Sequence, residues 1–597
     1  MKTLVEKTLL IATFTFVVFV CFYNLNFLAV RAYDEGRNAV NAFEMYLNPT
    51  SFLYTTFDNQ IDTWNTKPPL LIWLQVLFMN IFGPGEWAIR LPSALAGIGI
   101  AFMILWFVKK SIGSTWVVLT SWCLLFSNWL FTGVHVLRTG DYDATFTLFS
   151  LSFVFCFYNY SQSRHIKPLV ISCIFLTLAI LTKGIAAFFF LPGIFLFLIL
   201  NKKLKEILLS LNFWKAIIIP LVFGVGYYLL REILTPGYIH QIWINEIAGR
   251  YTQVENHGNV KQFDYYFQLL RNSFGLKVLS LAAISIPLSF LNKKYLSFVT
   301  YLTLLTLTFF LIVSTSKTKL FWYIAPVTPL ISILASMGIF LLFEITKDLV
   351  KIKLPEVIYF LAVVFLLSYP NIKSVINDRL KPRETNIQQY SLAYKLRKAQ
   401  KLNKPLSEEF KYVDFDLYKP HYLFYSYLSN RKYDFSNFNE TNIQSFDKIA
   451  ADIPALKAYI ESNFPIVKKE KFEDLIFYSI AEFSHSNDAR LLRFQKHWDK
   501  NKETKQIDIL RDPSDSTSYI LIKNEGFKLA SLSLYFRRTN PDQTFEYDVV
   551  HLSDNWDYKN HEGYDLKFIK LRNPASQLEL KGLDSSGNEM WVQTKPL

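Results

Sequence analysis

Apolar runs of membrane-spanning length dominate the first 370 residues of this chain, and they constrain its fold more than any other feature. A transmembrane helix needs roughly 20 consecutive apolar residues, and by this measure we find about eleven candidate spans. They lie at about residues 8–30, 88–108, 115–135, 143–159, 168–182, 184–200, 213–234, 274–291, 295–314, 321–343 and 355–370. We therefore predict an α-helical polytopic membrane domain over residues 1–370.

The remaining residues, 371–597, have the character of a soluble protein, with charges throughout and no cysteine. Helical patterns and short alternating strand patterns are mixed there, and the last hundred or so residues favour β-structure. The helical patterns lie at 392–400 and 453–463, and the strand patterns at 411–418, 519–522, 531–537, 546–551 and 566–570. We predict a C-terminal soluble α+β domain without a catalytic motif.

The net charge of +14 is explained by membrane topology. The basic residues are spread over the loops between spans, and no basic block with interleaved aromatics suggests nucleic-acid binding. With the N-terminus in the cytoplasm, the pairs Lys109–Lys110 and Lys293–Lys294 and the cluster at 202–205 fall on the cytoplasmic side, as the positive-inside rule expects. The loop at residues 31–90 and the tail then face outward. We predict a multi-pass protein of a bacterial inner membrane, with its active site and C-terminal domain on the periplasmic side.

The first outer loop contains acidic and basic residues beside a membrane surface. A helical pattern runs from Glu35 to Leu47, directly after Asp34, and Lys67-Pro68-Pro69 precedes a short apolar helix at 70–82. Both segments suit helices at the membrane interface. Because proline is tolerated in a first helical turn, Lys67 is expected at a helix N-terminus, where an anion is favoured.

Positive residues are otherwise scarce on the outer face, yet they cluster at its short turns. They are Arg138, Lys183, Arg250, Lys317 and Lys319. Such residues could hold a phosphate group, or each could merely extend toward lipid headgroups. The outer carboxylates also have two interpretations, because Asp34, Glu35, Asp141 and Asp143 could serve a site or simply cap helices. His257 alone suggests a structural residue.

An ordered series of motifs on this face resembles the GT-C superfamily of membrane glycosyltransferases. The resemblance is to the branch of the lipid A aminoarabinose transferase and the protein O-mannosyltransferases, and it covers about residues 1–370. Its motifs are Asp34-Glu35-Gly36-Arg37, Lys67-Pro68-Pro69-Leu70 with Trp73, Arg90-Leu91-Pro92-Ser93, residues 138–143, Leu181-Thr182-Lys183-Gly184, Gly249-Arg250-Tyr251 with His257, and Ser316-Lys317-Thr318-Lys319 with Trp322-Tyr323.

The resemblance implies transfer of a sugar from a polyprenyl-phosphate donor to a lipid, glycan or protein acceptor. Asp34 would be the catalytic base that takes the proton of the acceptor hydroxyl. Since the leaving group is already a phosphate anion, no second carboxyl acting as an acid is needed. The reaction would invert the configuration at the anomeric carbon of the sugar. Supporting roles would fall to Glu35, Arg37, Asp141 and Asp143. Donor phosphate binding would fall to Lys67, Arg138, Lys183, Arg250, Lys317 and Lys319.

Two points stay open at this level. Relatives in the aminoarabinose branch carry an acidic residue where this chain has Thr66, so we predict neither cofactor nor metal, although a divalent metal is not excluded. The alternative function is a transporter or flippase of lipid-linked saccharides. That class is expected to show an inverted repeat and broken helices, whereas we find no internal repeat.

Overall fold

The computed structural model describes residues 2–252, 262–350, 356–380, 390–401, 410–414, 419–429, 434–437, 443–452 and 454–482, and the strands between residues 507 and 596. His257 lies outside the described residues. The chain forms two compact units, one of Met1–Leu406 with Tyr418–Lys432 and one of Ser407–Leu417 with Tyr433–Leu597. The boundary predicted at residue 370 falls inside a helix of the first unit.

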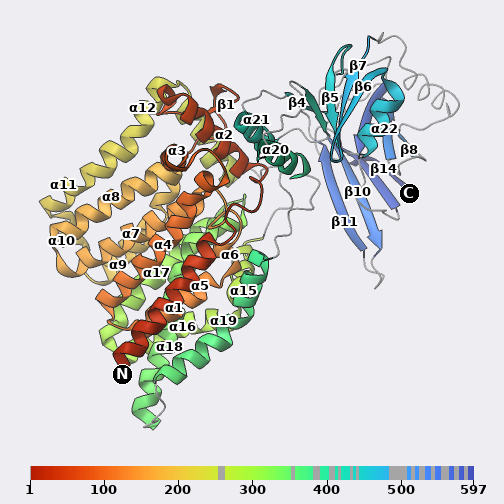
Figure 1. Ribbon diagram of the computed structural model, residues 1–597. Helices are drawn as coiled ribbons and strands as arrows, with labels where there is room; N and C mark the ends of the chain where they lie inside the picture. The colour runs from red at the N-terminus through yellow and green to blue at the C-terminus, as the bar shows by residue number, and fades with distance from the viewer. Residues whose placement is uncertain are drawn as a thin grey trace. The chain divides into compact units, whose positions relative to one another are not determined.

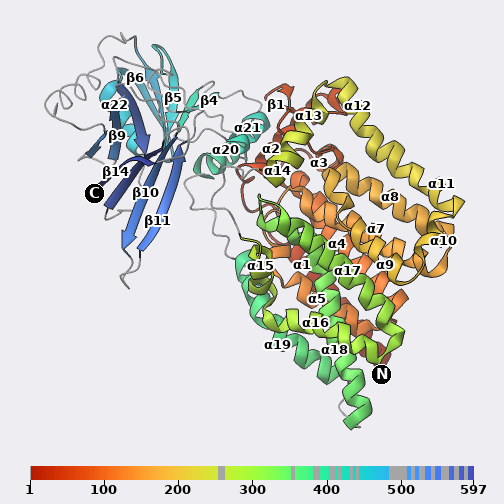
Figure 2. The ribbon, with the colours of Figure 1, turned by 180° about the vertical axis from the view of Figure 1, so that it is seen from behind.

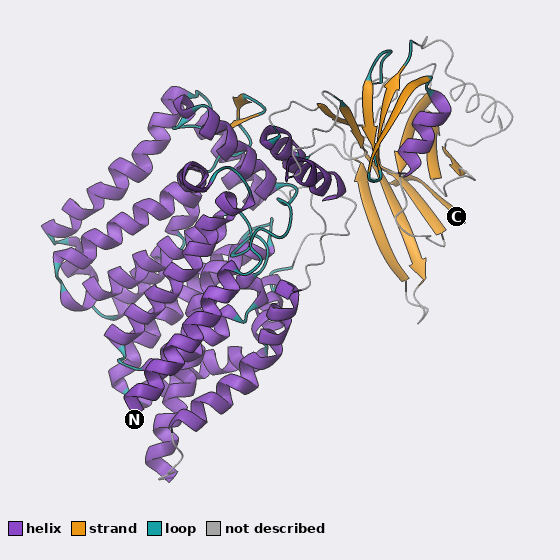
Figure 3. Ribbon diagram, in the orientation of Figure 1, coloured by secondary structure: helices purple, strands orange, loops and turns teal. Residues whose placement is uncertain are grey.

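The first unit is a helical bundle (Figure 1; Figure 3). The helical segments that make up most of the bundle are α1 (Lys2–Phe22), α4 (Glu86–Ser111), α5 (Thr115–Phe126), α6 (Trp129–Thr132), α7 (Tyr142–Ser163), α8 (Ile166–Lys183), η2 (Gly184–Phe188), α9 (Leu191–Leu200), α10 (Leu204–Leu208), α11 (Leu211–Ile219), η3 (Pro220–Val225), α12 (Gly226–Leu234), α15 (Tyr265–Phe274), α16 (Leu276–Leu291), α17 (Lys293–Thr315), η5 (Phe321–Val327), α18 (Thr328–Val350) and α19 (Glu356–Leu380).

The α-helical polytopic fold is confirmed, but fewer helices than the predicted eleven are long enough to cross a membrane alone. Among the described residues, 7 helices are long and apolar enough, or up to 8 if the bent pair α15–α16 is one span. The difference arises at short apolar helices such as α5 and α9, of 12 and 10 residues. At about 1.5 Å per residue, neither covers a hydrocarbon layer of about 30 Å by itself.

Two helices form in the first outer loop where the sequence predicts them. They are α2 (Asp34–Leu47) and α3 (Leu70–Phe82), and Pro69 caps the N-terminus of α3. Figures 1 and 2 place them, together with α12, α13 (Tyr238–Ile242) and α14 (Gly249–Thr252), at one end of the bundle, whereas the N-terminus lies at the other end. Loops far apart in sequence therefore meet at one end.

Aromatic side chains fill much of the bundle core. The rings of Phe107 and Phe155 stack with centroids 3.9 Å apart, which joins α4 to α7. The buried Tyr301 hydroxyl donates to the carbonyl oxygen of Val154 at 2.7 Å, which ties α17 to α7. A buried phenol needs such a partner, because an unpaired hydroxyl in apolar surroundings costs free energy.

Two helices that follow α19 pack in the first unit, which contains the candidate membrane spans and is called the membrane unit below. They are α20 (Ser391–Lys401) and α21 (Pro420–Leu428). The Tyr425 hydroxyl donates to Glu86 at 2.7 Å and accepts from the backbone N–H of Val30 at 2.9 Å. Arg397 also reaches Glu86, at 2.9 Å. These contacts fix the chain that leads into α2.

Gly36 is where α21 approaches α2 most tightly. A Cβ atom at this position would lie 2.7 Å from the backbone nitrogen of His421 and 2.9 Å from the carbonyl oxygen of Arg31. Both are backbone atoms, so neither can rotate away. We expect Gly36→Ala to lower the stability of the unit by about 1–3 kcal/mol, as overpacking does, measured as thermal unfolding of the purified protein. Gly85→Ala is the matched control, since a Cβ atom at that position would have no other atom within 4 Å. An unchanged melting temperature for Gly36→Ala would contradict this contact.

The second unit contains three sheets and α22 (Pro454–Asn463). A mixed five-stranded sheet has the order β4-β3-β5-β7-β6, with β3 parallel to both β4 and β5. The others are antiparallel, with orders β11-β10-β13-β14 and β12-β9-β8. The strands are β3 (Lys411–Asp414), β4 (Asp434–Asn437), β5 (Lys448–Ala451), β6 (Ile466–Phe472), β7 (Leu475–Ile480), β8 (Ile507–Arg511), β9 (Ser518–Lys523), β10 (Ser531–Thr539), β11 (Phe545–Leu552), β12 (Tyr564–Ile569), β13 (Gln577–Leu583) and β14 (Glu589–Pro596).

Candidate functional site

Three consecutive residues at the start of α7 connect charged groups of several loops. Asp141 lies beside His135 and Asp34. The ring of Tyr142 lies 5.5 Å from Lys67 Nζ. Asp143 accepts from Lys183 at 2.5 Å. The segment therefore joins the predicted base to two of the predicted phosphate ligands.

Asp34 lies at the acidic end of this site. It is the first residue of α2, and Tyr33 before it has a left-handed φ of 65°. Asp34, His135 and Asp141 each place one side-chain atom within 4.8 Å of the others. The Asp34 side chain is only half-buried, as a base that must meet an acceptor requires.

His135 lies beside these carboxylates, and their charges affect its pKa. Burial opposes its protonation, but Asp141 and, more weakly, Asp34 and Asp143 outweigh this and raise the pKa of His135. Burial alone would raise the pKa of Asp141, yet His135 and Thr139 lower it below its usual value. The imidazole ring stacks on Trp322, with centroids 3.8 Å apart. The neighbouring carboxylates thus favour the protonated form of His135.

The raised pKa of His135 predicts a pH-dependent contribution to stability. Its contribution is fully present below the unfolded value of about 6.5 and is lost as the pH rises through the higher folded value. We expect His135→Gln to lower the melting temperature more at pH 6 than at pH 9. His165→Gln, which changes an exposed histidine at the start of α8, should have a small effect at both pH values. A destabilisation by His135→Gln that does not vary with pH would exclude this charge.

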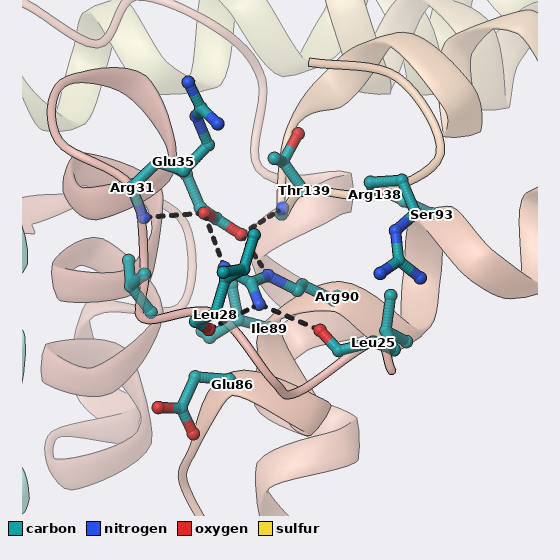
Figure 4. A network of polar contacts seen from close by, with 12 residues as sticks. Leu25, Leu28, Arg31, Glu35, Glu86, Ile89, Arg90, Ser93, Arg138 and Thr139 are labelled. Carbon is teal, nitrogen blue, oxygen red and sulfur yellow. Dashed lines mark hydrogen bonds and ion pairs between the residues drawn. The ribbon is translucent and has the colours of Figure 1, made fainter. Parts of the chain in front are cut away.

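Glu35 faces a different neighbour from Asp34, because successive residues of a helix point about 100° apart. Its carboxylate accepts from the backbone N–H groups of Arg31 at 2.7 Å and Gly140 at 2.8 Å. Arg90 of α4 donates to both of its oxygens, at 2.7 and 3.0 Å (Figure 4). Arg90 and Glu35 are 2% and 1% exposed. Glu35 therefore binds the segment before Asp34 to the turn before Asp141, which is a supporting role.

Three cations gather at the other end of the site. Lys67 Nζ lies 3.6 Å from Glu246 Oε1, and the Arg250 guanidinium lies 3.1 Å from Glu246 Oε2. Lys183 is close enough to interact electrostatically with both Lys67 and Arg250. Tyr323 lies 5.2 Å from Lys183 and from Arg250. The cluster combines the loop before α3, the end of α8, and α14, as an anion site built from separate segments would.

The remaining predicted site residues have more distant or structural positions. The backbone N–H groups of Lys317 and Thr318 donate to the carbonyl oxygen of Arg250, and the buried Lys319 donates to that of Ser316 at 2.5 Å. Arg138 donates to the carbonyl oxygens of Tyr23 and Asn24 after α1. In this structure these bonds direct Arg138 toward the end of α1 and not toward Lys67.

Arg37 is held by an acidic residue. Its guanidinium forms two bonds to Asp62, at 2.8 and 2.6 Å, and lies over the rings of Phe57 and Trp64. Burial would raise the pKa of Asp62, but Arg37 and neighbouring donors lower it overall. Arg37 therefore pairs with an acidic residue in this structure.

The same site also has the donor set for a divalent cation. Two carboxylates and an imidazole, from Asp34, Asp141 and His135, are ligands that zinc accepts. A ligating imidazole must be neutral, however, whereas these carboxylates favour the protonated form of His135. At the position where relatives carry an acid, the Thr66 hydroxyl instead donates to Glu246 at 3.1 Å. The absence of a metal ion stays a prediction.

Several residues of the site were not predicted as such from sequence. Arg90 is a charged residue inside an apolar run, which is itself an indication of function or buried pairing. Glu246 lies four residues before Arg250, the spacing of a helical ion pair. His135 carries no comparable local pattern, and its place depends on the left-handed turn that contains it.

Comparisons with known proteins show which proteins this chain resembles. The family model described as dolichyl-phosphate-mannose-protein mannosyltransferase matches residues 66–228. An uncharacterized protein of Aquifex aeolicus (strain VF5) is 26% identical over 332 residues, which are 54% of this chain and 62% of that protein. The undecaprenyl phosphate-alpha-4-amino-4-deoxy-L-arabinose arabinosyl transferase of Shewanella sediminis (strain HAW-EB3) is 25% identical over 317 residues, 52% of this chain and 56% of that protein. The chain thus matches less than two thirds of the length of these relatives.

A solved structure has the same fold. The crystal structure of ArnT from Cupriavidus metallidurans bound to undecaprenyl phosphate is similar with a TM-score of 0.60 and 16% sequence identity, over 79% of this chain and 97% of that chain. Together these findings confirm the resemblance to GT-C membrane glycosyltransferases of the aminoarabinose transferase and protein O-mannosyltransferase branch.

Proposed function

We propose that this relative of the GT-C enzymes is an inverting glycosyltransferase. It moves a sugar from a polyprenyl-phosphate donor to a hydroxyl of a lipid, glycan or protein acceptor at the periplasmic face of the inner membrane. The observation that carries the proposal is the segment Asp141–Asp143, which connects the half-buried Asp34 carboxylate to the cations Lys67 and Lys183. A base and an anion site side by side are what this reaction needs.

The chemistry follows from these two ends of the site. Asp34 accepts the proton of the acceptor hydroxyl as its oxygen attacks the anomeric carbon. The bond between that carbon and the donor phosphate oxygen breaks, and its electron pair leaves with the phosphate. Lys67, Lys183 and Arg250 stabilise the charge that develops there. Attack opposite the leaving group inverts the anomeric carbon, and the products are the glycosylated acceptor and polyprenyl phosphate.

The supporting residues fix the geometry of this step. Glu35 and Arg90 hold the backbone on both sides of the acidic cluster. His135 lies beside Asp34 and Asp141, and a protonated imidazole there lowers the pKa of Asp141. Neither role requires a metal ion. The membrane supplies the environment of the polyprenyl chain.

Assay of the purified protein with an undecaprenyl-phosphate-linked sugar tests the proposal. We expect transfer to an acceptor from a panel of lipid A, glycans and hydroxyl-bearing peptides. Lys67→Met should raise the KM for the donor about 10- to 100-fold, the effect of losing a charge-assisted contact. Lys110→Met, at an exposed lysine that ends α4, is the matched control. If the protein transfers no sugar but moves the lipid-linked sugar across the bilayer of liposomes that contain no acceptor, the result would instead support the transporter alternative.

A further inference from the structure

A half-buried acidic residue, Glu246, lies in the cation cluster and has no role in the chemistry proposed above. It belongs to η4 (Trp243–Ala248). Its Oε1 accepts from Thr66 at 3.1 Å and lies 3.6 Å from Lys67 Nζ, and its Oε2 lies 3.1 Å from Arg250. The same carboxylate thus binds two of the three cations that would hold the donor phosphate.

The charge of Glu246 is persistent. Burial would raise its pKa, but Arg250, Lys67, Thr66 and Lys183 outweigh this and hold the pKa at about 2. Among the described residues, the other titratable group that faces it is the half-buried phenol of Tyr228. A carboxylate among three cations resembles a bound anion in both charge and hydrogen bonding.

We propose that Glu246 competes with the lipid phosphate for Lys67 and Arg250, and that it thereby weakens the binding of the product more than that of the donor. This inference rests on the proposed function. The donor is a phosphodiester with one negative charge. The product is a phosphomonoester, which carries about −1.5 to −2 charges at pH 7 because its second pKa is about 6. A fixed negative charge repels the second species more strongly.

The consequence for turnover is product release. Cations strong enough to stabilise a leaving phosphate would also retain the doubly charged product, and release of product limits the rate of many enzymes. Glu246 offsets this tendency, since it can bind Lys67 and Arg250 again as the phosphate departs. Glu246 is therefore a specificity-determining residue, because it discriminates between lipid phosphates of different charge.

Binding measurements on the full-length protein in detergent test the idea without any transfer reaction. The probes are undecaprenyl phosphate and its methyl diester, which carries a single charge. We expect Glu246→Gln to tighten binding of the monoester on the order of tenfold at pH 8 and about threefold at pH 5.5. Binding of the diester should tighten about threefold at both pH values. The protonation of His135 also depends on pH, but His135 is present in both proteins, so its effect cancels in the ratio of variant to wild type.

Matched variants separate charge from structure. Glu246→Asp keeps the charge and should bind both probes like the wild type, whereas Glu246→Ser removes it and should repeat the result of Glu246→Gln. Glu206→Gln removes the same charge from an exposed pair with Arg164 and should change neither affinity. Weaker binding by both neutral variants, or an equal gain for both probes at pH 8, would overturn the inference.

The outcome for Lys67→Met distinguishes this inference from the function on which it rests. If that variant still binds undecaprenyl phosphate normally, the proposed phosphate site is wrong. If it loses binding but the neutral Glu246 variants show no preference for the monoester, only the role of Glu246 fails.

Discussion

Replacing Asp34 with asparagine should lower the rate of sugar transfer about 10²- to 10⁴-fold, the range lost with a general base. Asparagine keeps the shape of the side chain but cannot take the proton of an acceptor hydroxyl. Because Asp34 is half-buried at the first position of α2, the change should leave expression and membrane insertion normal. The measurement is kcat with saturating donor and acceptor.

The control for Asp34→Asn lies in the same outer loop. Asp58 is exposed in the turn between β1 (Thr56–Phe57) and β2 (Gln60–Ile61), and its φ of 53° suits asparagine equally well. Asp58→Asn should therefore transfer sugar at the wild-type rate. Near-normal transfer by Asp34→Asn would remove Asp34 from the chemistry and leave Asp141 as the carboxylate to examine. Binding of undecaprenyl phosphate should survive in Asp34→Asn, since the cations are untouched.

Replacing Arg90 with methionine should be the most destabilising single change in the membrane unit, at about 3–5 kcal/mol. A guanidinium has five N–H donors, and the bonds of Arg90 use all of them. Two reach Glu35, and the others reach the carbonyl oxygens of Leu25, Leu28 and Ala29 at 2.8–2.9 Å. Methionine would leave the buried Glu35 carboxylate without a counter-ion and three carbonyl groups without their donor.

Thermal unfolding of the purified protein measures this effect. Arg90→Lys should fail to restore stability, because an ammonium group has three donors and cannot form the two-pronged bond. Arg164→Met is the contrast, because it breaks a pair with Glu206 in which the side chains are 27% and 65% exposed, and pairs of that kind contribute about 0–1 kcal/mol. Equal effects of the two changes would mean that burial does not decide the strength of the Arg90 pair.

The Arg90 network also explains why a stability change should reach the active site. Glu35 accepts from Gly140, and Gly140 directly precedes Asp141. Its other oxygen accepts from Arg31, three residues before Asp34. Loss of Arg90 therefore loosens both segments that carry the acidic cluster. We infer that Arg90 affects activity by holding these two segments in position and does not contact the substrate.

Local sequence patterns determined the secondary structure near the site well. The proline pair before Leu70 marked the start of α3, and the helical spacing after Asp34 marked α2. Such features depend on neighbours within a few residues, so a sequence states them directly. The number of full spans was less well determined, because apolar composition does not reveal where a helix stops short, as α5 and α9 do.

By itself, then, the sequence determined that this is a polytopic helical protein whose loops carry a base candidate and several cations. Only the tertiary structure decided which of these charges meet. Asp34 and Glu35 are adjacent in sequence, yet Asp34 lies beside His135 and Asp141, whereas Glu35 forms an ion pair with Arg90. Lys67 and Arg250 meet at Glu246 across more than 170 residues. The physical reason is that ion pairing depends on distance and burial, which are set by how helices pack and not by the order of residues along the chain.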